Sequence, residues 1–120
     1  MHTFEKKHRL LKKQDFNDVF KEPSRFSSHG FTFLYKENAH KHARIGIALS
    51  KKIINKSFER NKVKRLLRES FRLQSELPAI DIVVLAKPRL SRYSYREIRT
   101  NLDGLWHTLS EQYKHQSLES

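Results

Sequence analysis

The segment at residues 57–74 combines the spacing of a packed helix with a high density of positive charge. Between residues 60 and 72, six of the thirteen side chains are Lys or Arg. At about 100° per residue, five of these cations fall with Asn61 into an arc of roughly 140°, beside an arc of apolar positions. The positive arc holds Arg60, Asn61, Lys64, Arg65, Arg68 and Arg72, and the apolar arc holds Val63, Leu66, Leu67, Ser70 and Phe71. The segment predicts a helix that buries one face against a domain core and exposes a positive one.

The positive face needs an external partner. The pairs Arg60 with Lys64, Lys64 with Arg68 and Arg68 with Arg72 place like charges at i,i+4, and each such pair destabilises a helix by roughly 0.2–0.5 kcal/mol. Over the whole chain 25 Lys and Arg stand against 13 Asp and Glu, a formal net charge of +12. A polyanion usually neutralises such an excess, so nucleic-acid phosphates are the predicted partner. The alternative is a face that only keeps the protein in solution.

The remaining periodicity predicts one domain with a mixed architecture. A short helix with Leu10, Leu11, Phe16, Val19 and Phe20 is ended by Pro23, and strands follow over 31–35, 45–49 and 80–86, with a possible short strand over 26–28 and a helix over 94–113. This order is typical of an α+β fold, a single α/β sandwich with a mixed, mostly antiparallel sheet and helices packed against it. The whole chain, 1–120, forms this one domain, with residues 1–9 and 114–120 expected to be mobile.

The strands also suggest how the sheet is connected. Strands 31–35 and 45–49 are expected to form an antiparallel hairpin, and strand 80–86 to run parallel to strand 45–49, because a helical crossover joins them. Strand 80–86 is apolar on both faces except at Asp81, which predicts a central position. Gly46 and Ala48 leave one face of the second strand free for close packing.

Aromatic residues gather in the first half of the chain. Phe16 and Phe20 are spaced i,i+4, and Phe31, Phe33 and Tyr35 share one face of a strand. These rings are either core, or they line a groove between the first helix and the sheet where unpaired bases stack. The composition leaves both interpretations open.

Several classes of function are disfavoured. The chain has no Cys and only three Gly, which excludes disulfides and thiolate sites and makes a Gly-rich phosphate loop improbable. The histidines are interpreted as surface loop residues rather than metal ligands, and Asp15 with Asp18 as helix-start charge. We expect no catalytic residue and no metal site in the protein. With no signal-peptide pattern and no long apolar run, a cytoplasmic protein without membrane contact is expected.

Several segments together resemble the protein subunit of bacterial ribonuclease P, a family known for an Arg-Asn-Arg motif. They are Ala48–Lys52 and Arg60–Glu69, with Arg9–Leu10, Asp15–Phe16, Val19–Phe20, Arg44–Gly46, Asp81–Val84, Ala86–Lys87 and Leu102–Trp106. The third residue of the motif is Lys62, where the family usually has Arg. A Lys keeps the charge but lacks the bidentate geometry of a guanidinium.

The resemblance implies a ribonucleoprotein endonuclease that removes the 5′ leader from precursor tRNA. Its RNA subunit would carry the chemistry and hold most of the Mg²⁺, while one protein per RNA raises substrate affinity and magnesium-ion binding. The implied RNA contacts are Lys51, Lys52, Arg60, Asn61, Lys62, Lys64, Arg65 and Arg68, and the implied leader-binding cleft holds Phe16, Phe20, Phe31 and Phe33. The family also implies a left-handed crossover before strand 80–86.

Three other functions compete with this interpretation of the sequence. A ribosomal-type protein that binds rRNA without processing it fits the size and charge equally well. A DNA-binding helix is disfavoured because, apart from Asn61, the segment has few side chains suited to base edges. A membrane-surface helix is disfavoured because its apolar face continues an ordinary core pattern.

Overall fold

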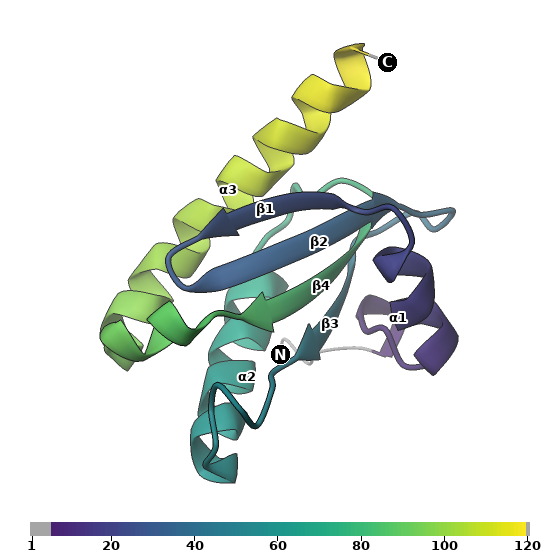
Figure 1. Cartoon of the computed structure of the whole chain (residues 1–120). Coiled ribbons are helices and arrows are strands. Elements are labelled where there is room, and N and C mark those ends of the chain that lie inside the picture. The colour runs from purple at the N-terminus through teal and green to yellow at the C-terminus, as the bar shows by residue number, and fades with distance from the viewer. Residues whose placement is uncertain (1–5, 120) are drawn as a thin grey trace.

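The computed structural model describes residues 6–119 and forms a four-stranded sheet with helices on both faces (Figure 1). The elements are, in chain order, the 3₁₀ helix η1 (Lys6–His8), α1 (Lys13–Phe20), β1 (Ser24–Ser28), β2 (Phe31–Glu37), β3 (Arg44–Ala48), α2 (Ser57–Arg72), β4 (Ile80–Ala86), the 3₁₀ helix η2 (Pro88–Arg92) and α3 (Tyr95–Glu119). This is the predicted α+β class, with the possible first strand present and slightly longer than expected.

The strand order is β1-β2-β4-β3. β4 runs parallel to β3, as predicted, and antiparallel to β2. The predicted hairpin between 31–35 and 45–49 is wrong, because β4 lies between these strands and β2 forms its hairpin with β1. The physical reason is the composition of β4, which is apolar on both faces except at Asp81 and is therefore stabilised most between two other strands.

The larger core lies between the sheet and the helices α2 and α3. Alternation along β2 directs Phe31, Phe33 and Tyr35 into this core. Trp106 of α3 is fully buried and packs edge-on against Phe33 and Phe71, with ring centres 5.4 and 5.7 Å away. Its indole N–H donates a 2.8 Å hydrogen bond to the Ser70 hydroxyl, which satisfies the polar groups inside the core.

A smaller core lies on the opposite face of the sheet, beneath α1. Its buried members are Leu10, Val19, Leu34 and Val83. The ring of Phe16 rests on Gly46, where an ideal Cβ atom would come within 2.6 Å of two ring carbons. The prediction that the small residues of strand 45–49 allow close packing is therefore confirmed at Gly46.

Both ends of the described chain have secondary structure and contacts with the sheet. Residues 6–8 form η1, Arg9 pairs with Ile45 in a parallel bridge, and the Leu10 N–H donates to the Ile45 carbonyl at 3.0 Å. Residues 1–5 lie outside the described part, and the mobility of residues 6–9 stays a prediction. Residues 114–119 continue α3, where Gln116 accepts a hydrogen bond from the Tyr35 hydroxyl. The mobility of this tail likewise stays a prediction, and residue 120 lies outside the described part.

None of the helices within residues 6–119 has both the length and the apolar composition needed to cross a membrane.

Candidate nucleic-acid interface

α2 carries the two faces that its sequence predicts. Val63, Leu67, Ser70 and Phe71 are buried against the sheet and α3, and Leu66 is half-buried. The large core accounts for this apolar face. Because these positions face inward, the cations on the neighbouring face lie at the protein surface.

Arg60 joins the start of α2 to the loop that follows β3. Its Nη1 atom donates hydrogen bonds to the carbonyls of Ile54 and Asn55, at 2.8 and 3.1 Å. The same loop carries Lys51 and Lys52, which are both exposed. A guanidinium has five N–H donors, so Arg60 can hold the loop and still donate to a phosphate. The structure therefore brings these three predicted residues together at one end of α2.

Further along α2, Arg68 lies beside a cation that the sequence analysis did not assign. Burial lowers the pKa of the Arg68 guanidinium, and the positive charge of Arg9 lowers it further. Arg9 is held there by its bridge with Ile45. Only the Arg9–Leu10 pair of the family resemblance pointed to this residue. Because the ordinary pKa of an arginine lies far above neutrality, Arg68 keeps its charge at neutral pH even with its pKa lowered.

Lys62 lies at the edge of α2 that faces α3, about 60° beyond Arg65 on a helical projection. Its Nζ atom is 4.0 Å from the ring centre of Tyr95, in the first turn of α3. Glu69, seven residues later, also faces α3 and pairs with Arg99 at 3.8 Å. On a helical projection Lys62 is about 200° from Arg60. The structure thus places Lys64, which is half-buried, on one arc with the exposed Arg65 and Arg68, and it places Lys62 outside this arc.

The four predicted cleft residues do not lie together. Phe16 is half-buried on the α1 face of the sheet, and Phe20 is 46% exposed on the same helix. Phe31 and Phe33 are each 1% exposed and belong to the core on the opposite face. The prediction that these two line the cleft is wrong, because their alternation along β2 directs them toward Trp106. The half-buried residues that pack against the same small core as Phe16 are Ala48 and Leu85.

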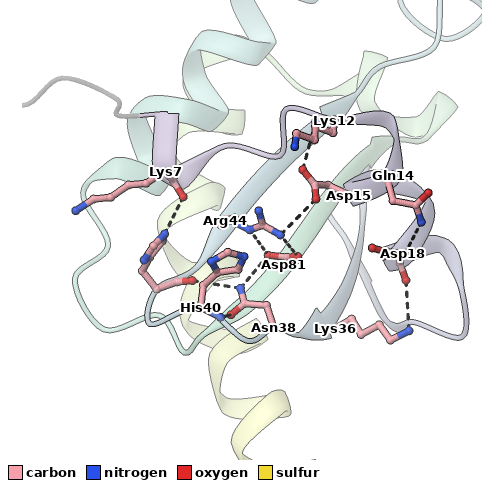
Figure 2. A network of polar contacts seen from close by, with 11 residues as sticks. Lys7, Lys12, Gln14, Asp15, Asp18, Lys36, Asn38, His40, Arg44 and Asp81 are labelled. Carbon is pink, nitrogen blue, oxygen red and sulfur yellow. Dashed lines mark hydrogen bonds and ion pairs between the residues drawn. The ribbon is translucent and has the colours of Figure 1, made fainter.

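A network of charged groups connects α1 to the sheet (Figure 2). Arg44 of β3 donates from Nε and Nη2 to the two carboxylate oxygens of Asp81 in β4, at 2.8 and 2.7 Å. The hydrogen bond to Asp81 raises the pKa of Arg44, against the effect of burial. Asp15 of α1 lies 3.8 Å from the same Nη2 atom, and its other oxygen accepts from the Lys12 N–H at 3.3 Å. The network therefore fixes the start of α1.

The end of α1 is held as well. Lys36 of β2 donates from Nζ to the carbonyls of Asp18 and Lys21, at 3.3 and 2.9 Å. Sequence analysis missed this clamp and the Arg44 network, since it interpreted Asp15 and Asp18 only as helix-start charge. The available signal was a single charged residue in each of two otherwise apolar strands, Arg44 in β3 and Asp81 in β4.

The described part of the chain contains no group of three or more His, Asp or Glu residues that could hold a metal ion. Two of the histidines pack edge to face: the ring centres of His8 and His42 are 5.0 Å apart, and the ring planes meet at 74°. The Asp15 and Asp81 carboxylates face Arg44. What the geometry offers is therefore fixed positive charge and exposed rings.

A positive helix on one face of an α+β sheet, with an aromatic helix clamped to the other, defines a nucleic-acid-binding protein. Comparison with known proteins identifies its family. The family model "Ribonuclease P" matches residues 4–110. The ribonuclease P protein component of Legionella pneumophila (strain Lens) is 47% identical over 113 residues, covering 94% of this chain and 98% of that protein. The ribonuclease P protein component of Marinobacter nauticus is 41% identical, and the match covers 93% of this chain and 86% of that protein.

Solved structures agree with this assignment. The Staphylococcus aureus RNase P protein is 29% identical with a TM-score of 0.77, covering 85% of this chain and 94% of that one. The Thermotoga maritima RNase P protein is 33% identical with a TM-score of 0.71, and the match covers 82% of this chain and 94% of that one. The chain therefore belongs to the ribonuclease P protein family. Its function is that of a ribonuclease P protein component, in tRNA processing and RNA binding, rather than that of a ribosomal-type protein.

Proposed function

We propose that this protein binds the RNA subunit of ribonuclease P through the exposed cations of α2 and the loop before it. The contacts are Lys51, Lys52, Arg60, Asn61, Lys64, Arg65 and Arg68, joined by Arg9, with Lys62 contributing from the α3 edge of the helix. The observation that carries the proposal is the placement of Arg9 beside Arg68, where both burial and a like charge lower the pKa of Arg68. RNA phosphates relieve this repulsion and give the site its partner.

The single-stranded 5′ leader of precursor tRNA binds on the other face of the sheet, beside α1. Phe20 offers an exposed ring, and Phe16 a half-buried one, on which unpaired bases can stack. The Arg44 network and Lys36 hold this helix at both ends. The two faces let one protein contact the catalytic RNA and the leader at the same time.

Cleavage itself belongs to the RNA subunit, with the Mg²⁺ ions that the reaction uses. In this proposal the protein acts by binding and positioning. By neutralising phosphates it lowers the repulsion between substrate and catalytic RNA, which raises substrate affinity and favours magnesium-ion binding to the RNA. We assign one protein to each RNA and place the complex in the cytoplasm.

The proposal is tested by equilibrium binding in two steps. The protein is first titrated with a bacterial ribonuclease P RNA over a series of salt concentrations, and tight binding with a steep salt dependence is expected. The reconstituted complex is then titrated with precursor tRNA and with mature tRNA. Tighter binding of the precursor only when protein is present supports the leader site. Equal affinities for the two tRNAs with and without protein would contradict it.

A further inference from the structure

Phe58 is a large aromatic residue that the fold does not use. It lies in the first turn of α2 and is 64% exposed. It is absent from both hydrophobic cores and from the residues packed against them. On the same helix, Val63, Leu67 and Phe71 are all buried. Core packing therefore does not explain why an aromatic ring stands at this position.

The surroundings of Phe58 are polar and positively charged. The Lys56 ammonium lies 5.8 Å from the centre of its ring. Asn61, Lys62 and Arg65 follow at i+3, i+4 and i+7, so they share its side of the helix, and all three are exposed. The ring thus stands among one amide and three cations on a rigid helix.

We propose that Phe58 is a stacking platform for one unpaired nucleotide of the RNA that α2 binds. The base lies on the face of the ring, while Lys56 and Arg65 contact the flanking phosphates and Asn61 offers its amide to the base edge or the sugar. This inference rests on the proposed binding of RNA by α2 and adds a contact to it. A single ring among cations matches the alternation of base and phosphate along a single strand. An apolar protein partner would need a contiguous apolar patch instead.

The test uses the full-length protein and a bacterial ribonuclease P RNA, with the dissociation constant measured over a salt series. The variants are Phe58→Ala, Phe58→Leu and Phe58→Tyr, with Leu73→Ala as control, because Leu73 is 60% exposed just after the other end of α2. Phe58→Ala should weaken binding by roughly 5- to 150-fold, the loss expected for one stacked base. The salt dependence should not change, since no charge is removed. Phe58→Tyr and Leu73→Ala should bind within about twofold of the wild type.

Phe58→Leu separates stacking from simple burial of apolar surface. Leucine retains much of the apolar area but has no π face, so it should lose most of what alanine loses. Leucine binding as tightly as phenylalanine would overturn the stacking contact, and so would alanine with wild-type affinity. If the wild-type protein itself failed to bind the RNA, the proposed function would fall together with this inference. Unchanged thermal unfolding of the variants confirms that the fold is intact.

Discussion

The ring of Phe16 lies directly on the backbone of Gly46, with no room between them for a side chain. An ideal Cβ atom on Gly46 would be 2.6 Å from two of the ring carbons and 3.0 Å from a methyl carbon of Leu10. This contact packs α1 directly against the backbone of β3. The position of α1, and with it the exposed ring of Phe20, therefore depends on the absence of a side chain at Gly46.

Gly46→Ala should displace α1 and destabilise the protein. The added methyl group meets a ring held on one side by the sheet, and overpacking of this kind costs about 1–3 kcal/mol. The control is Gly104→Ala, because no atom lies within 4 Å of its ideal Cβ apart from its chain neighbours and the adjacent backbone of its own helix, and it stands in the exposed part of α3. Alanine there should stabilise the helix by roughly 0.5–1 kcal/mol. Chemical denaturation measures both values, and equal stabilities for the two variants would show that α1 shifts freely.

Arg44→Met should be strongly destabilising. The side chains of Arg44 and Asp81 are only 14% and 11% exposed, and the variant leaves the Asp81 carboxylate buried with Asn38 as its remaining side-chain partner. Removing one member of a buried pair costs about 3–5 kcal/mol. Arg99→Met is the matched control, since its pair with Glu69 is long and its side chain is 67% exposed. There the expected loss is about 0–1 kcal/mol. Similar losses at both sites, measured by urea unfolding, would argue against a structural role for the Arg44 network.

Phe20→Ala should weaken the binding of precursor tRNA to the reconstituted complex without harming the fold. If one leader base stacks on this exposed ring, the loss is about 1–3 kcal/mol. Affinity for mature tRNA, which lacks a leader, should not change. Phe33→Ala serves as the contrast, because this ring is buried against Trp106 and its removal should cost roughly 3–5 kcal/mol of stability. A Phe20 variant that loses affinity for both tRNAs equally would remove the ring from the leader site.

Arg65→Ala and Arg68→Ala should each weaken RNA-subunit binding and reduce the slope of log affinity against log salt by about one unit. Each substitution removes one cation from the exposed arc of α2 while leaving the buried arc intact. Lys114→Ala is a control with the same charge change on α3, where Lys114 pairs with Glu111. An unchanged slope for both arginine variants would place the RNA contact on another surface.

Stability should depend on pH through the start of α3. Glu97 accepts a hydrogen bond from the Ser94 N–H at 2.9 Å, and the Ser94 hydroxyl accepts one from the Glu97 N–H at 3.1 Å. Two hydrogen bonds with Ser94 lower the pKa of Glu97 below its ordinary value of 4.5. The one from the Ser94 backbone has the larger effect, and the one with its side chain the smaller. A lowered pKa means that the ionised group stabilises the fold above this value and loses the effect as the pH falls through the lowered pKa.

Glu97→Gln should therefore be less stable than the wild type near pH 7, and the difference should shrink as the pH falls below about 4.5. Thermal unfolding at several pH values measures it. Glu76→Gln, an exposed glutamate in the connection between α2 and β4, controls for the general effect of losing one negative charge. A difference between wild type and Glu97→Gln that stays constant from pH 7 to about pH 3 would rule out the ionised cap.

The sequence predicts the parts of this fold that local periodicity determines. The buried and positive faces of α2, and the buried strand β4, are strongly periodic or strongly apolar, so they were found without tertiary information. The pairing of β2 with β4 was missed because strand neighbours are chosen by packing, which a single sequence does not display. Phe31 and Phe33 were misplaced for a related reason, since alternation identifies a shared face but does not say which helices cover it.

The residues of the candidate site likewise fall into those that local spacing identifies and those that depend on distant contacts. The cations of α2 were found because they belong to one helix, where spacing alone puts them together. The roles of Arg9 and Arg44 were not found, because each residue acts on a partner more than thirty positions away in the chain. Arg9 acts on Arg68, and Arg44 acts on Asp81. Lys62 shows that closeness in sequence does not ensure closeness in the site, since it neighbours Asn61 in sequence but faces Tyr95 of α3.

In the proposed function, this protein assists a catalytic RNA by binding both the RNA and the substrate. The most direct measurement is cleavage of a 5′-leader precursor tRNA by a bacterial ribonuclease P RNA at low magnesium concentration, with RNA alone, protein alone and both together. We expect efficient cleavage only when both components are present, because in the proposed function the protein supplies charge and binding while the RNA supplies the chemistry. Cleavage by the protein alone, or no gain when protein is added to the RNA, would contradict it.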